Sequence, residues 1–593
     1  MNNKLFYSDV KSVQVLLALM KAHGIKRVIT SPGTSNASVV ISVQNDPWFE
    51  VFNAVDERHA AYLACGMSGA DNNPTAIVCT GATASRNYMP GLTEAYYRKL
   101  PILAITCSQV ASHCGNLYGQ FMDRSVQPKD VVKYSYHCAL IKDNEDFNTR
   151  EVELNKAILE LFRHGGGPVH INLETPFSAG FSTEKLPTVK KLTRVQAWDK
   201  NWPELDAETR VAVWIGSHKP FTPETERALE KFLLSHNAIA IGDRTSSYKG
   251  TAFISGSLVE LQNGMNNNLW GKLKPELVIQ IGEISGDYQS VIFMRRESKR
   301  VWRVSEDGEI RDLLGKLETA FEMPEQVFFE HYLSADEYDS EYRCNWIAAD
   351  KMIRENIPEL PFSNPYIARV LAEAIPENSV VHVGILNSLR AWNYFNSPKS
   401  VDSMSNVGGF GIDGCMSALI GASFINRERP HFIVLGDLSF FYDLNAMGNR
   451  SIGSNLRIVI VNNGLGEEFK NHLSPLSTLG DAANANLAAQ GHFGCMSRLL
   501  VKHFAEDLGF KYFAADSKET LQACLSEFSQ TKTEKPMVLE CFTTIEEENA
   551  ALKIMSEILV PTTSSILKTE IRKCVGAVLP NGLKSVIKNA IGR

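Results

Sequence analysis

The sequence predicts an α/β protein built from three doubly wound parallel-sheet domains. Short apolar, β-branched runs alternate with helical patterns along the whole chain, which is typical of parallel sheets covered by helices. The runs fall into three sets, and the polar stretches 184–205 and 335–362 separate the sets because they lose strand periodicity. A chain of 593 residues is long enough for three domains of ordinary size.

Each set supplies four predicted strands. The predicted strands, in order along the chain, are residues 27–30, 74–80, 100–108 and 167–173; 211–217, 237–243, 275–283 and 299–305; 379–384, 431–437, 456–463 and 535–542. We therefore expect domains at residues 1–190, 191–350 and 351–560, followed by a tail at 561–593.

The tail 561–593 is basic, and its last residues alternate apolar and basic side chains at helical spacing. An amphipathic helix of this kind could suit a membrane surface or a groove on a partner. It could equally pack on the body of its own chain, and the sequence leaves both readings open.

Composition argues for small-molecule chemistry. The formal net charge is -7, and no long basic run lies in the body of the chain, which argues against a nucleic-acid-binding surface. We expect neither a secretory leader nor a membrane span, and hence a cytoplasmic protein. The 11 cysteines form no Cys-x-x-Cys pair, so we interpret them as small buried side chains rather than as zinc ligands or nucleophiles.

Two polar side chains close neighbouring apolar runs in the third set. Asp437 ends one run, and Asn463 ends the next, 26 residues later. That separation fits one βαβ unit, with residues 437–455 as the crossover helix, so both side chains should lie at the carboxyl edge of one sheet. One carboxylate and one amide oxygen suit Mg²⁺, which prefers oxygen ligands and shares its coordination with phosphates. The amides of Leu438 and Ser439 could then receive phosphate groups.

Gly436-Asp437 followed by Asn462-Asn463 resembles the diphosphate-binding motif of thiamine diphosphate (ThDP) enzymes. The resemblance implies ThDP and Mg²⁺ as cofactors. It implies that Asp437, Asn463 and the backbone carbonyl of Leu465 bind the metal, with Gly436 beside the diphosphate. It also implies pyrimidine-binding, central and diphosphate-binding domains, in that order.

A second motif lies in the first domain. The segment FNAVDERHAAYLACGMSGA, residues 52–70, places Glu57 after an apolar run and at the start of an Ala-rich helix. It resembles the segment that carries the catalytic glutamate of ThDP enzymes, in which the carboxyl group assists proton transfer on the cofactor's aminopyrimidine ring. An acidic residue also simply favours a helix N-terminus, so the motif depends on its companion in the third domain.

Further segments fit the same family. In GGFGIDGCMSALIGA, Ile412 falls where the resemblance implies a wedge that bends the cofactor, and the carbonyl of Phe410 would accept from its amino group. Gln120 resembles the glutamine that reaches the reaction centre. Because Glu57 and Asp437 lie in different domains, the resemblance implies a site between subunits, and hence a homodimer or homotetramer.

Among ThDP enzymes, the segments around Asn387, Ile412 and Asp437 resemble those of 2-succinyl-5-enolpyruvyl-6-hydroxy-3-cyclohexene-1-carboxylate (SEPHCHC) synthases, up to about residue 560. That family decarboxylates 2-oxoglutarate and joins the product to isochorismate. The chain departs from it at three arginine positions, where residues 35, 406–408 and 108–110 carry none. Arginines clamp carboxylates with paired charged hydrogen bonds, so the substrates should differ.

The resemblance therefore predicts a 2-oxo acid decarboxylase that transfers the acyl carbanion to a carbonyl acceptor, such as a keto sugar or a specialised metabolite. A plain decarboxylase that releases an aldehyde is the alternative, and a non-catalytic ThDP-fold regulatory protein is an alternative of another class. We expect four side chains to face the substrate: Ser35, His59, Arg390 and His472.

Overall fold

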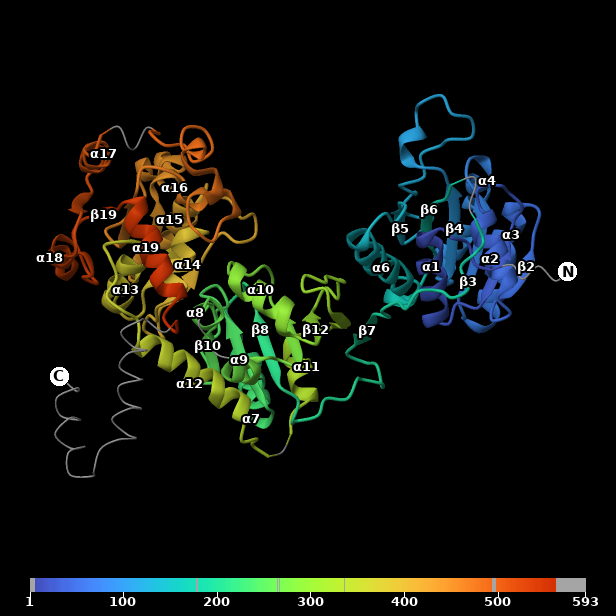
Figure 1. Ribbon diagram of the computed structural model, residues 1–593, viewed down its shortest axis with the longest axis horizontal. Coiled ribbons are helices and arrows are strands. Elements are labelled where there is room, and N and C mark those ends of the chain that lie inside the picture. Colours follow the sequence, from blue (N-terminus) through green and yellow to red (C-terminus); the bar gives the residue numbers. More distant parts are fainter. Residues whose placement is uncertain are drawn as a thin grey trace, which may run out of the picture. The chain divides into compact units, whose positions relative to one another are not determined.

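The computed structural model describes residues 6–560 except 177–179, 264, 266, 335 and 493–496. The basic tail predicted at 561–593 lies outside the described residues. The chain divides into two compact units (Figure 1). Unit 1 comprises residues 1–202 and 301–323, and unit 2 comprises residues 203–300 and 324–593. The domain boundaries given above remain predictions.

Unit 1 contains a six-stranded parallel sheet. Its strand order is β2 (Glu50–Asn53), β1 (Arg27–Thr30), β3 (Thr75–Thr80), β4 (Ile102–Ser108), β6 (Val169–Glu174) and β5 (Tyr134–Cys138). The helices are α1 (Lys11–Ala22), α2 (Ala37–Asn45), α3 (Glu57–Asp71), α4 (Thr83–Asn87), α5 (Met89–Arg98) and α6 (Asn144–Leu159). Strand β2 is an exposed edge strand, whereas the apolar run before Glu57 suggested a buried one.

Both faces of this sheet are buried. Along β3, Ala76 and Val78 pack in a cluster with α1, α2 and α6, while Ile77 and Cys79 pack in a second cluster with α3 and α5. Side chains of a strand point alternately to opposite faces, so an uninterrupted apolar run satisfies both clusters. This arrangement is the doubly wound sheet that the sequence predicts.

The strands of the central region fall into two groups, one in each unit. Unit 2 holds β10 (Phe253–Ser255), β9 (Ala238–Gly242), β8 (Val211–Ile215) and β11 (Leu277–Ile281), in that order. Unit 1 holds nearly all of β12 (Arg300–Ser305), then β13 (Leu317–Glu322) and β7 (Thr193–Gln196). The accompanying helices are α7 (Pro223–Ser235), α8 (Ser257–Glu260), α9 (Asn267–Leu273), α10 (Tyr288–Glu297), α11 (Glu325–His331) and α12 (Glu341–Glu355).

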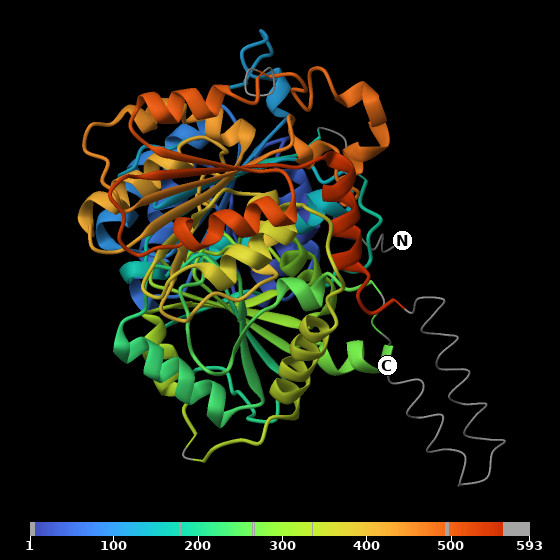
Figure 2. The ribbon, with the colours of Figure 1, turned by 90° about the vertical axis from the view of Figure 1, so that its left-hand side faces the viewer.

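The third sheet lies in unit 2 and is also parallel, with helices on either side of it (Figure 2). Its order is β15 (Asp402–Met404), β14 (Val380–Val383), β16 (His431–Gly436), β17 (Leu456–Asn462), β19 (Met537–Phe542) and β18 (Lys511–Ala515). The helices are α13 (Asn364–Ala374), α14 (Asn387–Asn393), α15 (Cys415–Ile425), α16 (Asp437–Tyr442), α17 (Leu500–Asp507), α18 (Lys518–Phe528) and α19 (Ile545–Ser556). Three parallel-sheet α/β domains are thus present, as the sequence predicts.

The crossover between β16 and β17 differs from the single long helix that the sequence suggested. Helix α16 ends at Tyr442, and a short 3₁₀ helix, Leu444–Gly448, follows it. Asp443 interrupts the helix because its carboxylate accepts hydrogen bonds from the backbone amide and the hydroxyl of Ser417, both at 2.6 Å. The two strands are neighbours nevertheless.

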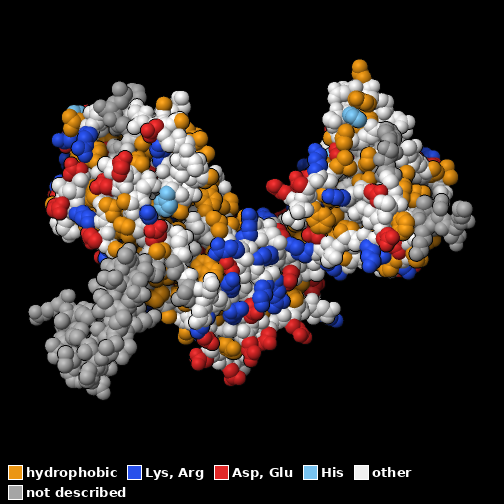
Figure 3. Space-filling view, in the orientation of Figure 1, with side chains coloured by type: hydrophobic (Ala, Val, Ile, Leu, Met, Phe, Trp, Pro, Cys, Tyr) orange, Lys and Arg blue, Asp and Glu red, His pale blue; other side chains and the backbone are white. Residues whose placement is uncertain are grey.

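Lys, Arg, Asp and Glu side chains are interspersed over the face of the molecule drawn in Figure 3. No helix within the described ranges is long and apolar enough to cross a membrane.

Candidate functional site

The edge at which β16 and β17 end is the centre of the candidate site in unit 2. The two strands pair in parallel, with Gly436 opposite Val461, so Asp437 and Asn463 follow neighbouring strand ends. This is the edge at which ligands of open α/β sheets collect. The pairing agrees with the prediction from the sequence that Asp437 and Asn463 follow strands that end at one edge of the sheet.

Asp437 is buried, with 2% of its surface exposed. Its Oδ2 accepts a hydrogen bond from the backbone amide of Gly464 at 3.0 Å. Nε2 of His492 lies 2.8 Å from the same oxygen. Gly464 has a φ of +81°, a left-handed conformation that glycine adopts without steric cost, and this turn directs its amide toward the carboxylate. The loop after β17 is therefore tied to the first residue of α16.

Asn463 and Leu465 complete the predicted oxygen set. The side-chain amide nitrogen of Asn463 donates to Oε2 of Glu467 at 3.1 Å, which fixes which end of the side chain is oxygen. Leu465 is nearly buried, and its amide lies 3.4 Å from Oδ1 of Asn463. A buried carboxylate, an amide oxygen and a loop carbonyl are hard oxygen donors, so the chemistry of these residues fits Mg²⁺.

The segment before α15 meets the start of α16. The hydroxyl of Ser439 donates to the backbone carbonyl of Ile412 at 2.5 Å. Phe410 has a φ of +55°, and its amide donates to the carbonyl of Asn406 at 3.2 Å. Residues 410–412 are thereby connected to the helix that begins with Asp437 and Leu438. These side chains were predicted to contact one cofactor, and that role remains a prediction.

Glu57 lies in unit 1, where it is the first residue of α3. The preceding Asp56 caps this helix, because its carboxylate accepts from the amide of Arg58 at 2.9 Å. Asp56 therefore caps the helix, and Glu57 is not needed for that role. The side-chain amide nitrogen of Asn87 lies 3.3 Å from Oε2 of Glu57. The sequence analysis did not identify Asn87, the last residue of α4. The only feature of the sequence that points to Asn87 is its position shortly after Gly81.

Three other predicted residues of unit 1 occupy different environments. Ser35 is buried, donates to the carbonyl of Cys107 at 2.8 Å and contacts the hydroxyl of Thr80. His59 is exposed on α3. Gln120 is exposed too, with a φ of +67°, in the segment 109–133 that follows β4 without a strand.

Arg390 and His472, in unit 2, make contacts within the protein. Nη2 of Arg390 lies 3.1 Å from both carboxylate oxygens of Glu468, and Nη1 contacts Asn387. The amide of His472 donates to Asn549 at 3.0 Å, and burial lowers the pKa of its ring. The Glu468 contact was not predicted, although Glu467 and Glu468 stand immediately after the Asn463 turn.

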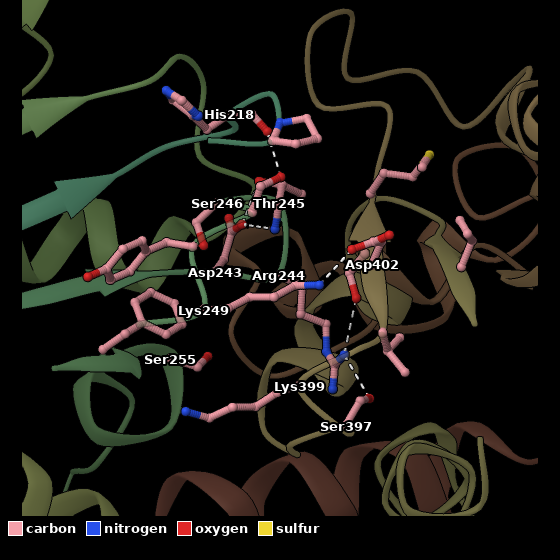
Figure 4. A pocket seen from close by; sticks show the side chains of 18 of the residues that line it. His218, Asp243, Arg244, Thr245, Ser246, Lys249, Ser255, Ser397, Lys399 and Asp402 are labelled. Carbon is pink, nitrogen blue, oxygen red and sulfur yellow. Dashed lines mark hydrogen bonds and ion pairs between the residues drawn. The ribbon is translucent and has the colours of Figure 1, made fainter. Parts of the chain in front are cut away.

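A separate cavity of about 1200 Å³ lies in unit 2 (Figure 4). It opens where the loops after β8 and β9 face the loops around β15. Several of its charged side chains contact other protein groups. Arg244 donates to the carbonyl of Trp392 at 2.6 Å and to Ser397 at 3.0 Å, and Lys249 pairs with Asp402 at 2.6 Å. The cavity thus identifies no ligand class, and none of the predicted site residues lines it.

Comparison with known proteins assigns the class. Residues 10–129 match the family described as thiamine pyrophosphate enzyme, N-terminal TPP binding domain. The chain belongs to the family of ThDP-dependent enzymes, and that family implies ThDP and Mg²⁺ as its cofactors.

Several relatives within that family bear one name. The 2-succinyl-5-enolpyruvyl-6-hydroxy-3-cyclohexene-1-carboxylate synthase of Bacteroides thetaiotaomicron is 31% identical over 563 residues, which cover 92% of this chain and 98% of the relative. The synthase of the same name from Flavobacterium johnsoniae is 26% identical over 567 residues, covering 93% and 99%. The predicted likeness to SEPHCHC synthases is confirmed.

Proposed function

We propose that this enzyme decarboxylates a small 2-oxo acid and joins the resulting acyl group to a carbonyl acceptor. The observation that carries the proposal is the oxygen set at the ends of β16 and β17. There, the Asp437 carboxylate is held by Gly464 beside Asn463. Asp437, Asn463 and Leu465 would hold Mg²⁺, and Gly436, Leu438 and Ser439 would lie against the diphosphate. When bound, ThDP supplies a carbon nucleophile that adds to the 2-oxo group and accepts the electron pair left by CO₂.

The protein's own part in this chemistry is proton transfer and positioning. Glu57 would protonate a ring nitrogen of the bound cofactor, and Asn87 holds the Glu57 carboxylate in place at 3.3 Å. Phe410 and Ile412 would orient the ring, and Gln120 would face the reacting carbon. The alternative, a plain decarboxylase that releases an aldehyde, needs the same residues and differs only in whether a proton or a second carbonyl takes the electron pair.

The acceptor is proposed from what the chain lacks. Serine stands at position 35, glutamine at 109 and valine at 407, where the resemblance to SEPHCHC synthases implies arginines. An acceptor such as a keto sugar or another specialised metabolite would place less demand on such cations. We further propose a homodimer or homotetramer. A non-catalytic regulatory role is the other-class alternative, and the paired Asp437 and Asn463 argue against it.

Release of CO₂ by the purified protein with ThDP and Mg²⁺ tests the proposal. The panel contains pyruvate, 2-oxobutanoate and 2-oxoglutarate, with and without added aldehydes and keto sugars. We expect release from at least one acid, and loss of that release by roughly 100-fold or more in Glu57→Ala, since general acid/base groups contribute on that order. The exposed Glu94→Ala is the control. If no acid yields CO₂ although ThDP is bound, the decarboxylase proposal is wrong.

A further inference from the structure

Arg124 is a buried arginine of unit 1 for which the described residues provide no ion pair with a carboxylate. Only 3% of its surface is exposed, and Nε donates to Oδ1 of Asn172 at 3.3 Å. Nη1 is buried and has no hydrogen bond within the described part of the chain. An ionised guanidinium is costly to bury unless its donors are satisfied, so this geometry calls for an acceptor.

The surroundings of Arg124 add positive charge. Arg86 lies nearby, with its Nη2 donating to the backbone carbonyl of Asp123 at 2.9 Å. Burial lowers the pKa of Arg124, and the charge of Arg86 acts in the same direction. The carboxylate of Asp123 is exposed and accepts from Ser125 at 2.6 Å. Two cations therefore lie close together, and an anion beside them would gain from both.

The guanidinium of Arg124 lies at the carboxyl edge of the sheet in unit 1, beside the residue that follows β3. It stacks so closely on Gly81, which follows β3, that a Cβ at this position would lie 2.8 Å from Nη1. The same Gly81 loop leads into α4, whose last residue, Asn87, contacts Glu57. Residues 81–87 therefore contact Arg124 at one end, through Gly81, and the proposed catalytic Glu57 at the other, through Asn87.

Two neutral hydroxyl groups, those of Ser35 and Thr106, also lie at this edge. Ser35 bonds to the carbonyl of Cys107, and the hydroxyl of Thr106 donates to Oδ1 of Asn172 at 3.1 Å. These groups already have partners in the protein. Arg86 and Arg124 are consequently the groups best able to attract an anion here.

We propose that Arg124 binds the carboxylate of a substrate and so makes an acid, rather than a neutral carbonyl compound, the preferred ligand at this edge. This inference rests on the proposed function. It deepens that function because it names the residue that selects the acid. A guanidinium forms two parallel hydrogen bonds with a carboxylate, which fixes the orientation of the acid as well as its charge.

Three kinds of carboxylate satisfy this chemistry, and paired substrates distinguish them. 2-Oxoglutarate and 2-oxopentanoate differ in the distal carboxylate of the donor. 4-Carboxybenzaldehyde and benzaldehyde differ in the carboxylate of the acceptor. The carboxylate that leaves as CO₂ is common to both donors, so a change in KM for both donors assigns Arg124 to that group.

The variants are Arg124→Met and Arg124→Lys, measured as holoenzyme with ThDP and Mg²⁺. We expect Arg124→Met to raise KM for one member of a pair, or for both donors, by about 10- to 100-fold, the loss typical of a charged hydrogen-bonded contact. The value of kcat should change less, and Arg124→Lys should recover part of the affinity. Arg150→Met is the matched control, because Arg150 is a half-buried arginine of the same sheet domain that contacts Tyr136.

Unchanged KM values for every donor and acceptor in folded Arg124→Met would overturn the proposal. If the wild-type protein releases no CO₂ from any acid, thermal shifts of the holoprotein with 2-oxoglutarate, at constant ionic strength, decide instead. A shift that the wild type and Arg150→Met show and Arg124→Met lacks supports the anion site even though the proposed reaction has failed. Equal shifts in all three proteins would refute it.

Discussion

At the residue scale, the orientation of Asp437 decides whether the site can hold a metal. Gly464 and His492 both contact Oδ2, at 3.0 and 2.8 Å. Partners that orient a ligating carboxylate from outside the coordination sphere commonly change metal affinity 10- to 100-fold when they are removed. The loop contact of Gly464 comes from the backbone, so His492 is the partner that a substitution can test.

We predict that His492→Ala weakens metal binding by roughly 10-fold in the presence of ThDP, because the Asp437 carboxylate loses one of the contacts that hold it. Mn²⁺, monitored by electron paramagnetic resonance, serves as the probe of the Mg²⁺ site. His503→Ala, an exposed histidine of α17, is the control and should bind as the wild type does. Equal Mn²⁺ affinities in the two variants would contradict the assigned role of His492.

The sequence identified Asp437 and Asn463 because strand ends and polar residues are local patterns. It did not identify His492 or Arg124, because the contacts that define them join distant segments. His492 lies 55 residues from Asp437, and Arg124 lies 48 residues from Asn172. No spacing rule connects such pairs. Nη1 of Arg124 is buried without a hydrogen bond among the described residues, and this results from packing that cannot be predicted from the sequence.

At the element scale, two buried carboxyl groups lie close together, one at the start of α10 and one at the end of α8. Asp287 caps α10, and its Oδ2 accepts from Ser257 at 2.5 Å. Glu260, the last residue of α8, is close enough to repel it, and its Oε2 has no hydrogen bond in the described region. Burial is the main cause that raises the pKa of Glu260, and Asp287 adds to the effect. The folded protein therefore favours protonated Glu260.

We predict that Glu260→Gln stabilises the protein at pH 7 by on the order of 1 kcal/mol or more, because a shift of one pKa unit corresponds to about that energy. A raised folded pKa gives stability that is present below the unfolded pKa and lost as pH rises. The difference between variant and wild type should thus be small near pH 4 and grow toward pH 7. Thermal unfolding across this range measures it.

The exposed Glu373→Gln, in α13, should show no such pH dependence. If Glu260→Gln is less stable than the wild type at every pH, the Glu260 carboxylate is satisfied by contacts that the geometry does not reveal, and the prediction is wrong.

Elements were predictable where burial on both faces produced uninterrupted apolar runs. The runs at β3, β4, β8, β16 and β17 all became central strands. Strand β5 was missed, and β2 was wrongly expected to be buried, because both lie at sheet edges, where only one face or neither is covered. The strand β18 was missed for the same reason.

At the scale of the whole molecule, the proposed catalytic groups lie in different units: Glu57 in unit 1 and Asp437 in unit 2. If each site takes Glu57 from one subunit and Asp437 from another, two inactive variants can complement each other. We predict that Glu57→Ala and Asp437→Asn, each inactive alone, regain about a quarter of wild-type activity when equal amounts are unfolded together and refolded, because about half of the dimers are then mixed and each mixed dimer has one intact site of two. CO₂ release measures the recovery.

Refolding each variant alone is the control for this experiment. No recovery in the mixture, with mixed dimers demonstrated by differently tagged chains, would mean that one subunit contains the whole site.

Every strand pairing described in the three sheets is parallel. Two parallel strands cannot be joined by a tight turn, so each pairing must wait until an intervening crossover segment has been ordered. Such contacts between distant segments slow the search for the native state and leave apolar strand edges exposed meanwhile. During synthesis, the folding chain should therefore depend on chaperones and on low concentration. A ligand that binds the ends of β16 and β17 early in folding would shorten the time during which the folding chain can aggregate.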